Sequence, residues 1–367
     1  MAVATETDRV EKAKSLLAEK GLDALIAAPG SDMAYLLGYF GHPSERPALL
    51  IIRSDGPHQV LIAAFESLAL PRLPADVNMT TYSETQNAFD VLSDVAGDYA
   101  STIRSVAVSD QIWGSVLLKL QDLFTNATME AASGYLRDLR MRKEPEEVSL
   151  LKAAAKRADS ALAQVLEAGL QGDSEASIAS RLGRPMQDGG LTDTWAIVAS
   201  GPNGASPHHH SGERVVSTGD AVVLDLGGAF HGYQADMTRT VFVESATAEE
   251  RAVYEVVRAA QEAAVQAARP GASCQSVDHA ARSVIAEAGY GEQFIHRTGH
   301  GIGLDIHEDP YIVEGNDLLL EPGMAHSVEP GIYLDGRFGV RIEDIVAITE
   351  TGAERLNHVS RELRIVG

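Results

Sequence analysis

The sequence has 367 residues, enough for two domains that each bury a core. It is 45% hydrophobic and 22% charged, and its net charge of −22 argues against nucleic acid or an anionic membrane surface as a partner. One cysteine, Cys274, excludes an intramolecular disulfide and fits a cytoplasmic protein. We expect no signal peptide and no transmembrane helix, since no apolar run approaches about 18 residues.

Residues 1–132 are expected to form an α/β domain. Apolar residues recur at helical spacing over 8–20, before Gly21, and a short helix is expected over 31–37. Short apolar runs that end at turn residues predict strands at 24–28, 48–52, 59–63 and 106–108. None of these elements carries catalytic spacing.

The loop at 38–47 is the exception in this domain. It combines aromatic residues, glycine and proline with His42 and Arg46, a composition typical of a binding loop. An ordinary solvated loop accounts for the same composition equally well.

A second domain is expected over 133–367. Its charged cluster at 137–147 is expected to start a long helix that ends at Gly169, and a helix at 174–187 and a strand at 195–199 follow. The same order then recurs, because a capping box at 247–250 opens a helix to 268, followed by a helix at 276–288 and further strands. This recurrence predicts two related halves packed around a shared site. Cys274 is expected in the polar turn between the last two helices, with an incidental role.

Asp225 and Asp236 lie on either side of a glycine-rich stretch, each within an apolar run. We expect two strands joined by a turn at Gly227, Gly228 and Gly232. Two carboxylates brought together in an apolar setting repel each other, and a divalent cation between them removes that cost. The alternative is that each aspartate caps a turn or pairs with Arg239.

Later stretches favour the metal interpretation. His300 and His307 lie in a glycine-rich segment, Glu329 ends a short apolar run, and Glu343 lies inside a strand-like run. The four carboxylates of Asp225, Asp236, Glu329 and Glu343 and the imidazole of His300 could hold two divalent ions, whose charge the four carboxylates balance. Such a two-metal site can hold a bridging hydroxide and stabilise an oxyanion.

These motifs, in this order, resemble the pita-bread metallopeptidases, which include methionine aminopeptidase, aminopeptidase P, prolidase and creatinase. The sequence is most similar to their proline-specific branch, the Xaa-Pro dipeptidases and Xaa-Pro aminopeptidases. The resemblance is strong from Asp138 to the C-terminus and loose before it. It implies an α/β N-terminal domain followed by an α+β pita-bread catalytic domain with pseudo-two-fold halves, which agrees with the recurring order of elements.

The resemblance also implies a role for each metal ligand. Asp225 should bind one metal in bidentate fashion, Asp236 and Glu343 should bridge both metals, and His300 and Glu329 should complete the second. A carboxylate-rich set with one imidazole favours Mn²⁺, although Co²⁺ or Zn²⁺ could be accepted. A bridging hydroxide would attack the carbonyl that precedes proline, so Glu343 counts among the catalytic residues.

Three histidines and one arginine match substrate-contacting positions of the branch. In the loop at 200–211, Pro207-His208 matches the family's Pro-His pair, and the neighbouring His209 and His210 are expected to be solvated. His307 matches a histidine that hydrogen-bonds the substrate or the tetrahedral intermediate. His296 should line the proline pocket. Arg341 should orient a carboxylate ligand. The alternative for His307 is a loop histidine whose hydrogen bonds are made within the protein, and the alternative for Arg341 is a surface ion pair.

Two alternatives to a dipeptidase remain. An Xaa-Pro aminopeptidase would act on longer peptides, and a non-enzymatic peptide-binding module is disfavoured because all five ligand positions are intact. A dipeptidase must recognise the free carboxylate of proline, and Arg46 or His42 could bind it. In a dimer, the loop that carries these two residues could come from the neighbouring subunit. We expect short proline-containing peptides as substrates, with a preference for dipeptides. We also expect a homodimer, although the sequence does not distinguish a dimer from a tetramer.

Overall fold

The computed structural model describes residues 6–367, and contacts within the chain divide it after Arg140 into two units, each described here by itself. The sequence placed this division at residue 132. The short helix α5 (Ser133–Arg140) lies between the two positions and goes with the first unit. No helix in the described range is long and apolar enough to cross a membrane.

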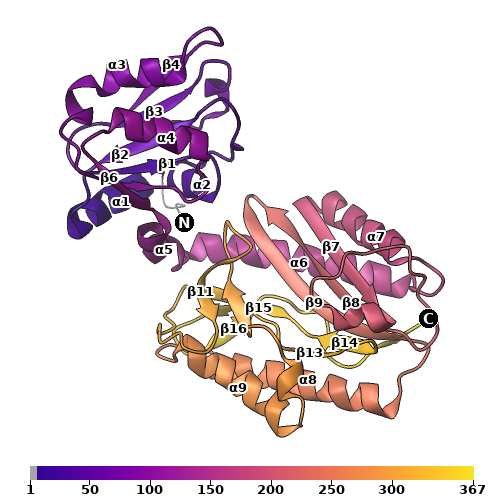
Figure 1. Ribbon diagram of the computed structural model, residues 1–367. Coiled ribbons are helices and arrows are strands. Elements are labelled where there is room, and N and C mark those ends of the chain that lie inside the picture. The colour runs from indigo at the N-terminus through magenta and orange to yellow at the C-terminus, as the bar shows by residue number, and fades with distance from the viewer. Residues whose placement is uncertain (1–5) are drawn as a thin grey trace. The chain divides into compact units, whose positions relative to one another are not determined.

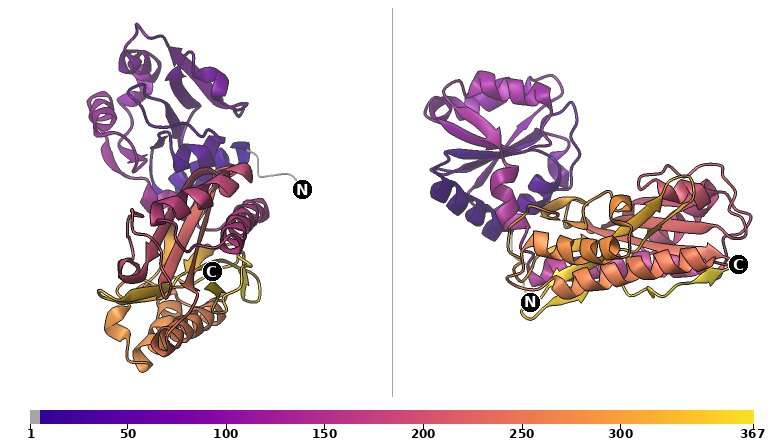
Figure 2. Two further views of the ribbon diagram at one scale, coloured as in Figure 1. Left: turned by 90° about the vertical axis from the view of Figure 1, so that its right-hand side faces the viewer. Right: turned by 60° about the horizontal axis from the view of Figure 1, so that its bottom comes forward.

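The first unit is built on one six-stranded mixed sheet with helices on both sides of it (Figures 1 and 2). Its strand order is β4-β3-β2-β1-β5-β6. The strands are β1 (Ala24–Ala27), β2 (Leu49–Arg53), β3 (His58–Ala63), β4 (Val77–Tyr82), β5 (Ser105–Val108) and β6 (Thr128–Ala131). Every position of β1 and β3 is buried, which explains why these strands appear in the sequence as unbroken apolar runs.

The helices of this unit cover the sheet with apolar side chains. They are α1 (Glu6–Lys20), α2 (Ser31–Leu37), α3 (Ala88–Ala100) and α4 (Gly114–Leu123), with the short 3-10 helix η1 (Ser67–Ala69). Leu92 of α3 and Leu120 of α4 share one core cluster with Ile26 and Ile51 of the sheet. All six elements predicted for this region are present, whereas α3, α4, β4 and β6 were not predicted.

The first half of the second unit packs two helices against a four-stranded sheet. α6 (Pro145–Glu167) and α7 (Glu175–Asp188) precede β7 (Thr192–Ser200), β8 (Ala221–Phe230) and β9 (Tyr233–Val243). The C-terminal β17 (Ile365–Val366) pairs in parallel with β9, and the sheet order is β17-β9-β8-β7. Leu162, Ile178 and Leu224 are fully buried in the core between these helices and strands.

The second half repeats this order with α8 (Ala248–Ala267) and α9 (Cys274–Glu287), a 3-10 turn η3 (Gly291–Gln293) and then strands. A five-stranded sheet has the order β11-β10-β12-β15-β16, and β13 pairs with β14. Its strands are β10 (Gly299–Gly301), β11 (Glu308–Ile312), β12 (Ala325–Val328), β13 (Gly331–Leu334), β14 (Phe338–Arg341), β15 (Asp344–Ile348) and β16 (Ala353–Arg355). The strands of both halves lie between the helix pairs (Figure 1), as the recurring order predicted.

The charged cluster at 137–147 starts the long helix as predicted: the helix begins at Pro145, because Glu144 caps it and the proline occupies a first-turn position that needs no N–H partner. One other prediction was wrong. Cys274 is not in a polar turn: it is fully buried as the first residue of α9, whose N-cap is Ser273.

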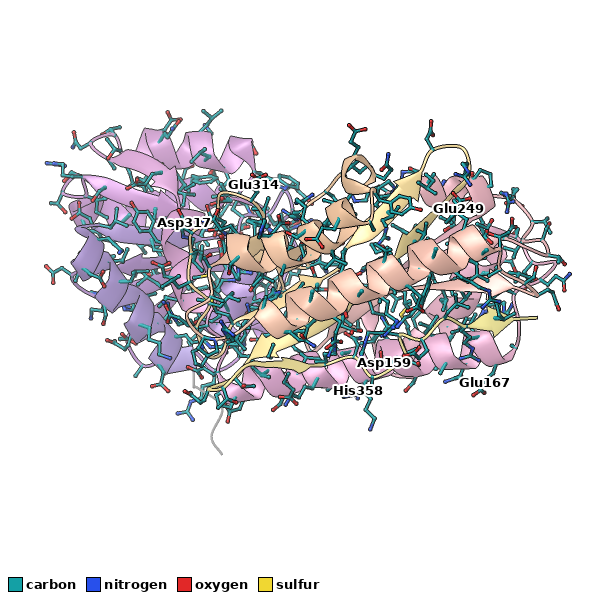
Figure 3. All side chains as sticks on the ribbon, turned by 90° about the horizontal axis from the view of Figure 1, so that it is seen from below. Asp159, Glu167, Glu249, Glu314, Asp317 and His358 are labelled. Atoms are coloured by element: carbon teal, nitrogen blue, oxygen red, sulfur yellow. The ribbon has the colours of Figure 1, made fainter. Side chains whose placement is uncertain are left out.

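A buried carboxylate on α6 fixes the C-terminal segment behind the sheet. Figure 3 shows Asp159 beside His358. The His358 backbone N–H donates to Asp159 over 2.5 Å, and the Asn357 side-chain amide donates to it over 3.1 Å. Asn357 in turn accepts the backbone N–H of Ile345 at 2.9 Å, so this contact reaches the strand that follows Glu343.

Candidate active site

The hairpin of β8 and β9 places two carboxylates on one face of its sheet. Asp225 lies opposite Thr238, and Asp236 lies opposite Gly227, so the aspartates occupy diagonal positions on the same face. Gly227 is inside β8 and not in the turn as predicted. A Cβ there would come within 2.6 Å of the Trp195 ring, so glycine lets this ring lie against the strand.

The second half supplies the remaining ligand candidates. His300 is on β10, and its Nε2 lies 3.6 Å from an Asp236 oxygen and 3.3 Å from a Glu329 oxygen. Its Nδ1 faces the Gly301 carbonyl oxygen at 3.1 Å, which places the ring proton on Nδ1 and leaves the Nε2 lone pair free for a metal. Thr238 donates its hydroxyl to Glu343 over 2.7 Å, and Asp236, His300 and Glu343 can reach a common ion.

These carboxylates cannot all be ionised together without added positive charge. Burial and the neighbouring carboxylates raise the pKa of Glu343 and of Asp236 well above their usual range, and burial raises that of Glu329 to about 7. Burial also lowers the pKa of His300 to about 3, so its imidazole is neutral. One oxygen each of Asp225 and Glu343 is buried without a hydrogen-bond partner in the described chain. Divalent cations fit this donor set, since they would satisfy both oxygens.

Arg341 is buried and fully engaged beside these ligands. It donates to Asp225 over 2.6 Å, to the Thr238 hydroxyl over 3.1 Å and to the Tyr333 hydroxyl over 3.0 Å. The Tyr333 hydroxyl also lies 2.8 Å from Nε2 of His296. A continuous hydrogen-bonded chain therefore links His296 to a metal-ligand candidate. Arg239, the alternative partner considered for the aspartates, instead pairs with Asp344 at 2.6 Å.

These groups open onto a cavity of about 640 Å³. The His307 ring stands edge-on to the His300 ring, with 4.1 Å between centroids. The cavity contains nine of the ten residues proposed from the sequence, together with apolar walls and one further cation. Its lining residues are Trp195, Ile197, Pro207, His208, Asp225, Asp236, His296, Arg297, His300, Ile306, His307, Glu329, Arg341 and Glu343.

The tenth proposed residue, Arg46, belongs to the first unit. Its guanidinium forms a two-pronged ion pair with Glu84, at 2.9 and 3.0 Å, and also contacts Glu45. Sequence reasoning missed Trp195, Arg297 and Tyr333. Arg297 directly follows His296, and Tyr333 lies four residues after Glu329, so nearness to motif residues is the signal that could have revealed these two.

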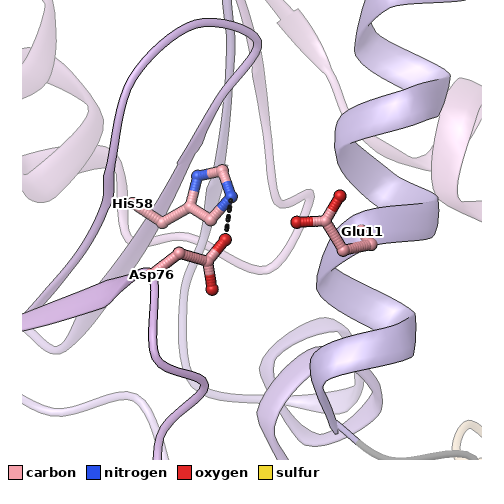
Figure 4. Close-up of side chains that lie close together, drawn as sticks. All are labelled: Glu11, His58 and Asp76. Carbon is pink, nitrogen blue, oxygen red and sulfur yellow. Dashed lines mark ion pairs between the residues drawn. The ribbon is translucent and has the colours of Figure 1, made fainter.

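A second cluster of possible ligands lies in the first unit, where His58 faces Asp76 and Glu11 (Figure 4). The His58 Nε2 is 3.3 Å from Asp76. However, the Arg53 backbone N–H donates to Nδ1 of His58 over 3.1 Å, so the neutral ring carries its proton on Nε2. That nitrogen points a proton, and not a lone pair, at the carboxylates, which disfavours a metal here.

Comparison with known proteins decides the family. Residues 149–350 match the model of metallopeptidase family M24, and residues 9–142 match the creatinase/prolidase N-terminal domain. The chain belongs to metallopeptidase family M24.

The relatives of this metallopeptidase span its whole length. It is 39% identical to a probable dipeptidase, PepE, of Mycobacterium tuberculosis, over 98% of this chain and 96% of that protein. It is 33% identical to the Xaa-Pro dipeptidase of Lactobacillus helveticus, over 97% and 98% of the two chains. The crystal structure of a prolidase from Thermococcus sibiricus superposes with a TM-score of 0.94 at 36% identity and covers all of both chains. These matches confirm the predicted fold class of an α/β domain followed by a pita-bread catalytic domain.

Proposed function

We propose that this metallopeptidase is an Xaa-Pro dipeptidase that uses two divalent cations, with Mn²⁺ preferred. One observation carries the proposal: the carboxylate and imidazole ligands share a cavity with apolar walls and with Arg297, whose guanidinium forms no hydrogen bond or ion pair with the described residues. The apolar walls suit a proline ring, and the guanidinium suits its free carboxylate. The similarity to the Xaa-Pro dipeptidase of Lactobacillus helveticus over nearly the whole chain supports it.

The two cations would be held by Asp225, Asp236, His300, Glu329 and Glu343. When bound, such cations polarise a carbonyl oxygen and ionise water near neutral pH. A donor set of four carboxylates and one imidazole favours a hard ion, which is why we propose Mn²⁺ ahead of Zn²⁺ or Co²⁺.

The surrounding residues would orient the peptide. Arg341 fixes the direction of the Asp225 carboxylate through a 2.6 Å contact. His208 and His307 face the cavity from two different loops, and burial lowers the pKa of His307, so its ring is neutral and can both donate and accept a hydrogen bond. His296 forms part of the wall beside the proline ring.

Arg297 is the group that we propose for the free carboxylate of the dipeptide. Arg341, the other arginine of the cavity, already uses three nitrogens on protein partners. The Arg297 guanidinium lies over the Tyr311 ring, with 4.5 Å to its centroid, and forms no hydrogen bond or ion pair with the described residues. A planar guanidinium binds a carboxylate through two parallel hydrogen bonds. Arg46 remains the second candidate, although Glu84 already neutralises its charge.

The test compares Ala-Pro, Ala-Pro amide and Ala-Pro-Ala, with Mn²⁺ and after chelation. A dipeptidase cleaves Ala-Pro far faster than the other two and loses this activity on chelation. Preferred cleavage of Ala-Pro-Ala would indicate an Xaa-Pro aminopeptidase instead, and a protein that binds metal but cleaves nothing would refute both.

Two arginine variants locate the carboxylate site. Arg297→Met should raise KM for Ala-Pro by roughly tenfold or more and leave the slow cleavage of the amide unchanged, because the amide carries no charge. Arg46→Ala serves as the matched variant in the loop at 38–47. An effect of Arg46→Ala alone would transfer the role to that loop.

We also propose that the enzyme is a cytoplasmic homodimer. The lone cysteine, which is buried, fits a reducing compartment. Light scattering coupled to size-exclusion chromatography measures the mass directly, and a mass of about 39 kDa would refute the dimer.

A further inference from the structure

A buried glutamate outside the cavity holds the loop that carries His208. Glu175 is the first residue of α7 and is fully buried. One of its oxygens accepts hydrogen bonds from the Ser200 backbone at 2.8 Å, the Ser200 hydroxyl at 2.7 Å and the Asn203 amide at 3.0 Å. The other accepts from Nε2 of His209 at 2.8 Å and from the Gly212 backbone at 3.2 Å.

These five donors all come from residues 200–212, which run from the last residue of β7 into the connection that leads to β8. They include Ser200, the 3-10 turn η2 (Gly201–Ala205) and Gly212, beyond the three histidines. Two backbone hydrogen bonds add to them: the Glu175 N–H donates to the Arg214 carbonyl, and the Ala176 N–H donates to the Gly212 carbonyl. A single carboxylate therefore ties together a loop rich in glycine and proline.

His209 was expected to be solvated, and this expectation was wrong, because its ring donates to Glu175 and its side chain is only 21% exposed. His208 is the neighbouring residue, exposed at the cavity. The His208 ring forms no hydrogen bond with any residue in the described range. The position of the His208 ring therefore depends on the backbone on either side of it. The hydrogen bond from His209 to Glu175 holds that backbone in place.

A purely structural role would also account for a satisfied carboxylate. A buried charge is nevertheless an expensive way to close a loop, since all its hydrogen bonds must be made to offset the loss of hydration. Such a fully satisfied network fixes one geometry more strictly than apolar packing does. Here the fixed element is the loop residue next to a cavity-lining histidine.

We propose that Glu175 and His209 are positioning residues that hold His208 at the distance required for contact with the substrate. The role rests on the proposed function, in which His208 touches the peptide. Neither positioning residue contacts the substrate or lines the cavity, so both act through the loop backbone.

A double-mutant cycle tests this role. Glu175→Gln keeps the shape of the side chain but turns one acceptor into a donor. We expect it to lower kcat/KM for Ala-Pro at least tenfold in the wild-type background. In a His208→Ala background we expect less than a twofold further loss, because the group that Glu175 positions is then absent. Equal losses in both backgrounds, or no loss in the first, would overturn the proposal.

Variants of the two neighbouring histidines provide a second test. His209→Leu should reproduce the loss, and His209→Gln should retain activity, because the glutamine amide can donate to Glu175 from the same place as Nε2. His210→Asn is the matched control, since His210 is exposed in the same loop. Loss of activity in His209→Gln equal to that in His209→Leu would overturn the proposal.

Two measurements separate positioning from unfolding. Metal content and the thermal midpoint should change little in His209→Leu while kcat/KM falls, and a parallel fall in metal content would overturn the proposed route through His208. A wild-type enzyme that cleaves no proline peptide would instead refute the proposed function, and with it this role.

Discussion

In the metal-free protein, Glu329 should contribute a fall in stability as pH rises from about 4.5 to about 7. In the metal-free protein, burial raises the pKa of Glu329 from 4.5 to about 7, so the folded state holds a proton that the unfolded chain releases near pH 4.5. A group with a raised pKa stabilises the fold while it is protonated, and this contribution is lost as pH rises through the folded-state pKa. His300 acts in the opposite sense below pH 6.5, because its pKa is lowered from 6.5 to about 3 and only the unfolded chain takes up that proton. The protons held by Asp236 and Glu343 act in the same sense as that of Glu329. The contribution of Glu329 is therefore measured as the difference between the wild-type protein and Glu329→Gln.

The size of the effect follows from the shift. A change from 4.5 to about 7 corresponds to about 3 kcal/mol of unfolding free energy. For a domain of this size, each kcal/mol moves the thermal midpoint by roughly 2–4 °C, so the contribution of Glu329, lost between about pH 4.5 and about pH 7, is roughly 6–12 °C.

The assay is thermal unfolding of chelated, dialysed protein, followed by circular dichroism between pH 5 and pH 8. Glu329→Gln keeps the size of the side chain but cannot ionise. The apoprotein of this variant should therefore lack the part of the fall in the thermal midpoint that Glu329 contributes. Glu350→Gln, at an exposed glutamate, should keep the wild-type slope. Equal slopes for wild type and Glu329→Gln would refute the reasoning. Calorimetry in two buffers should also show that Mn²⁺ binding releases fewer protons from the variant.

Three further outcomes follow from single contacts. Arg341→Met should weaken metal binding roughly 10- to 100-fold in equilibrium dialysis, because it removes the 2.6 Å contact that orients Asp225, and unchanged affinity would contradict that role. Thr247→Ala should lower the unfolding free energy by about 1 kcal/mol in urea, since Thr247 caps α8 in a reciprocal box with Glu250. Burial raises the pKa of the Cys274 thiol to about 12, so a thiol reagent at pH 8 should label it only after denaturation; labelling of the native protein would contradict this burial.

The sequence was most informative where the chemistry of a site requires a particular residue type. Asp225, Asp236, Glu329 and Glu343 could be named as candidates, because a carboxylate in an apolar run is costly unless it is paired or binds a metal. His300 could be named from its glycine-rich segment. The helix that begins at Thr247 could also be predicted, since its capping box is a local pattern. The alternation of helices and strands gave the two halves in the right order.

The sequence was least informative where a role depends on neighbours distant in the chain. Trp195 lines the cavity only because β7 pairs with β8 opposite Gly227, a register that no local pattern reveals. The importance of Glu175 depends on a loop that begins 25 residues later. His209 looked like its two neighbouring histidines, and only the fold distinguishes it from them.

The hairpin that carries the two aspartates has a consequence for protein engineering. Its tip is a two-residue turn at His231 and Gly232, which have φ angles of 49° and 83°, and His231 is exposed. The spacing of Asp225 and Asp236 is fixed by the strand ladder and not by this turn. We therefore expect a peptide tag or a reporter domain inserted at the tip to leave both aspartates in place, whereas deletion of a single residue within β8 would turn one aspartate to the opposite face of the sheet.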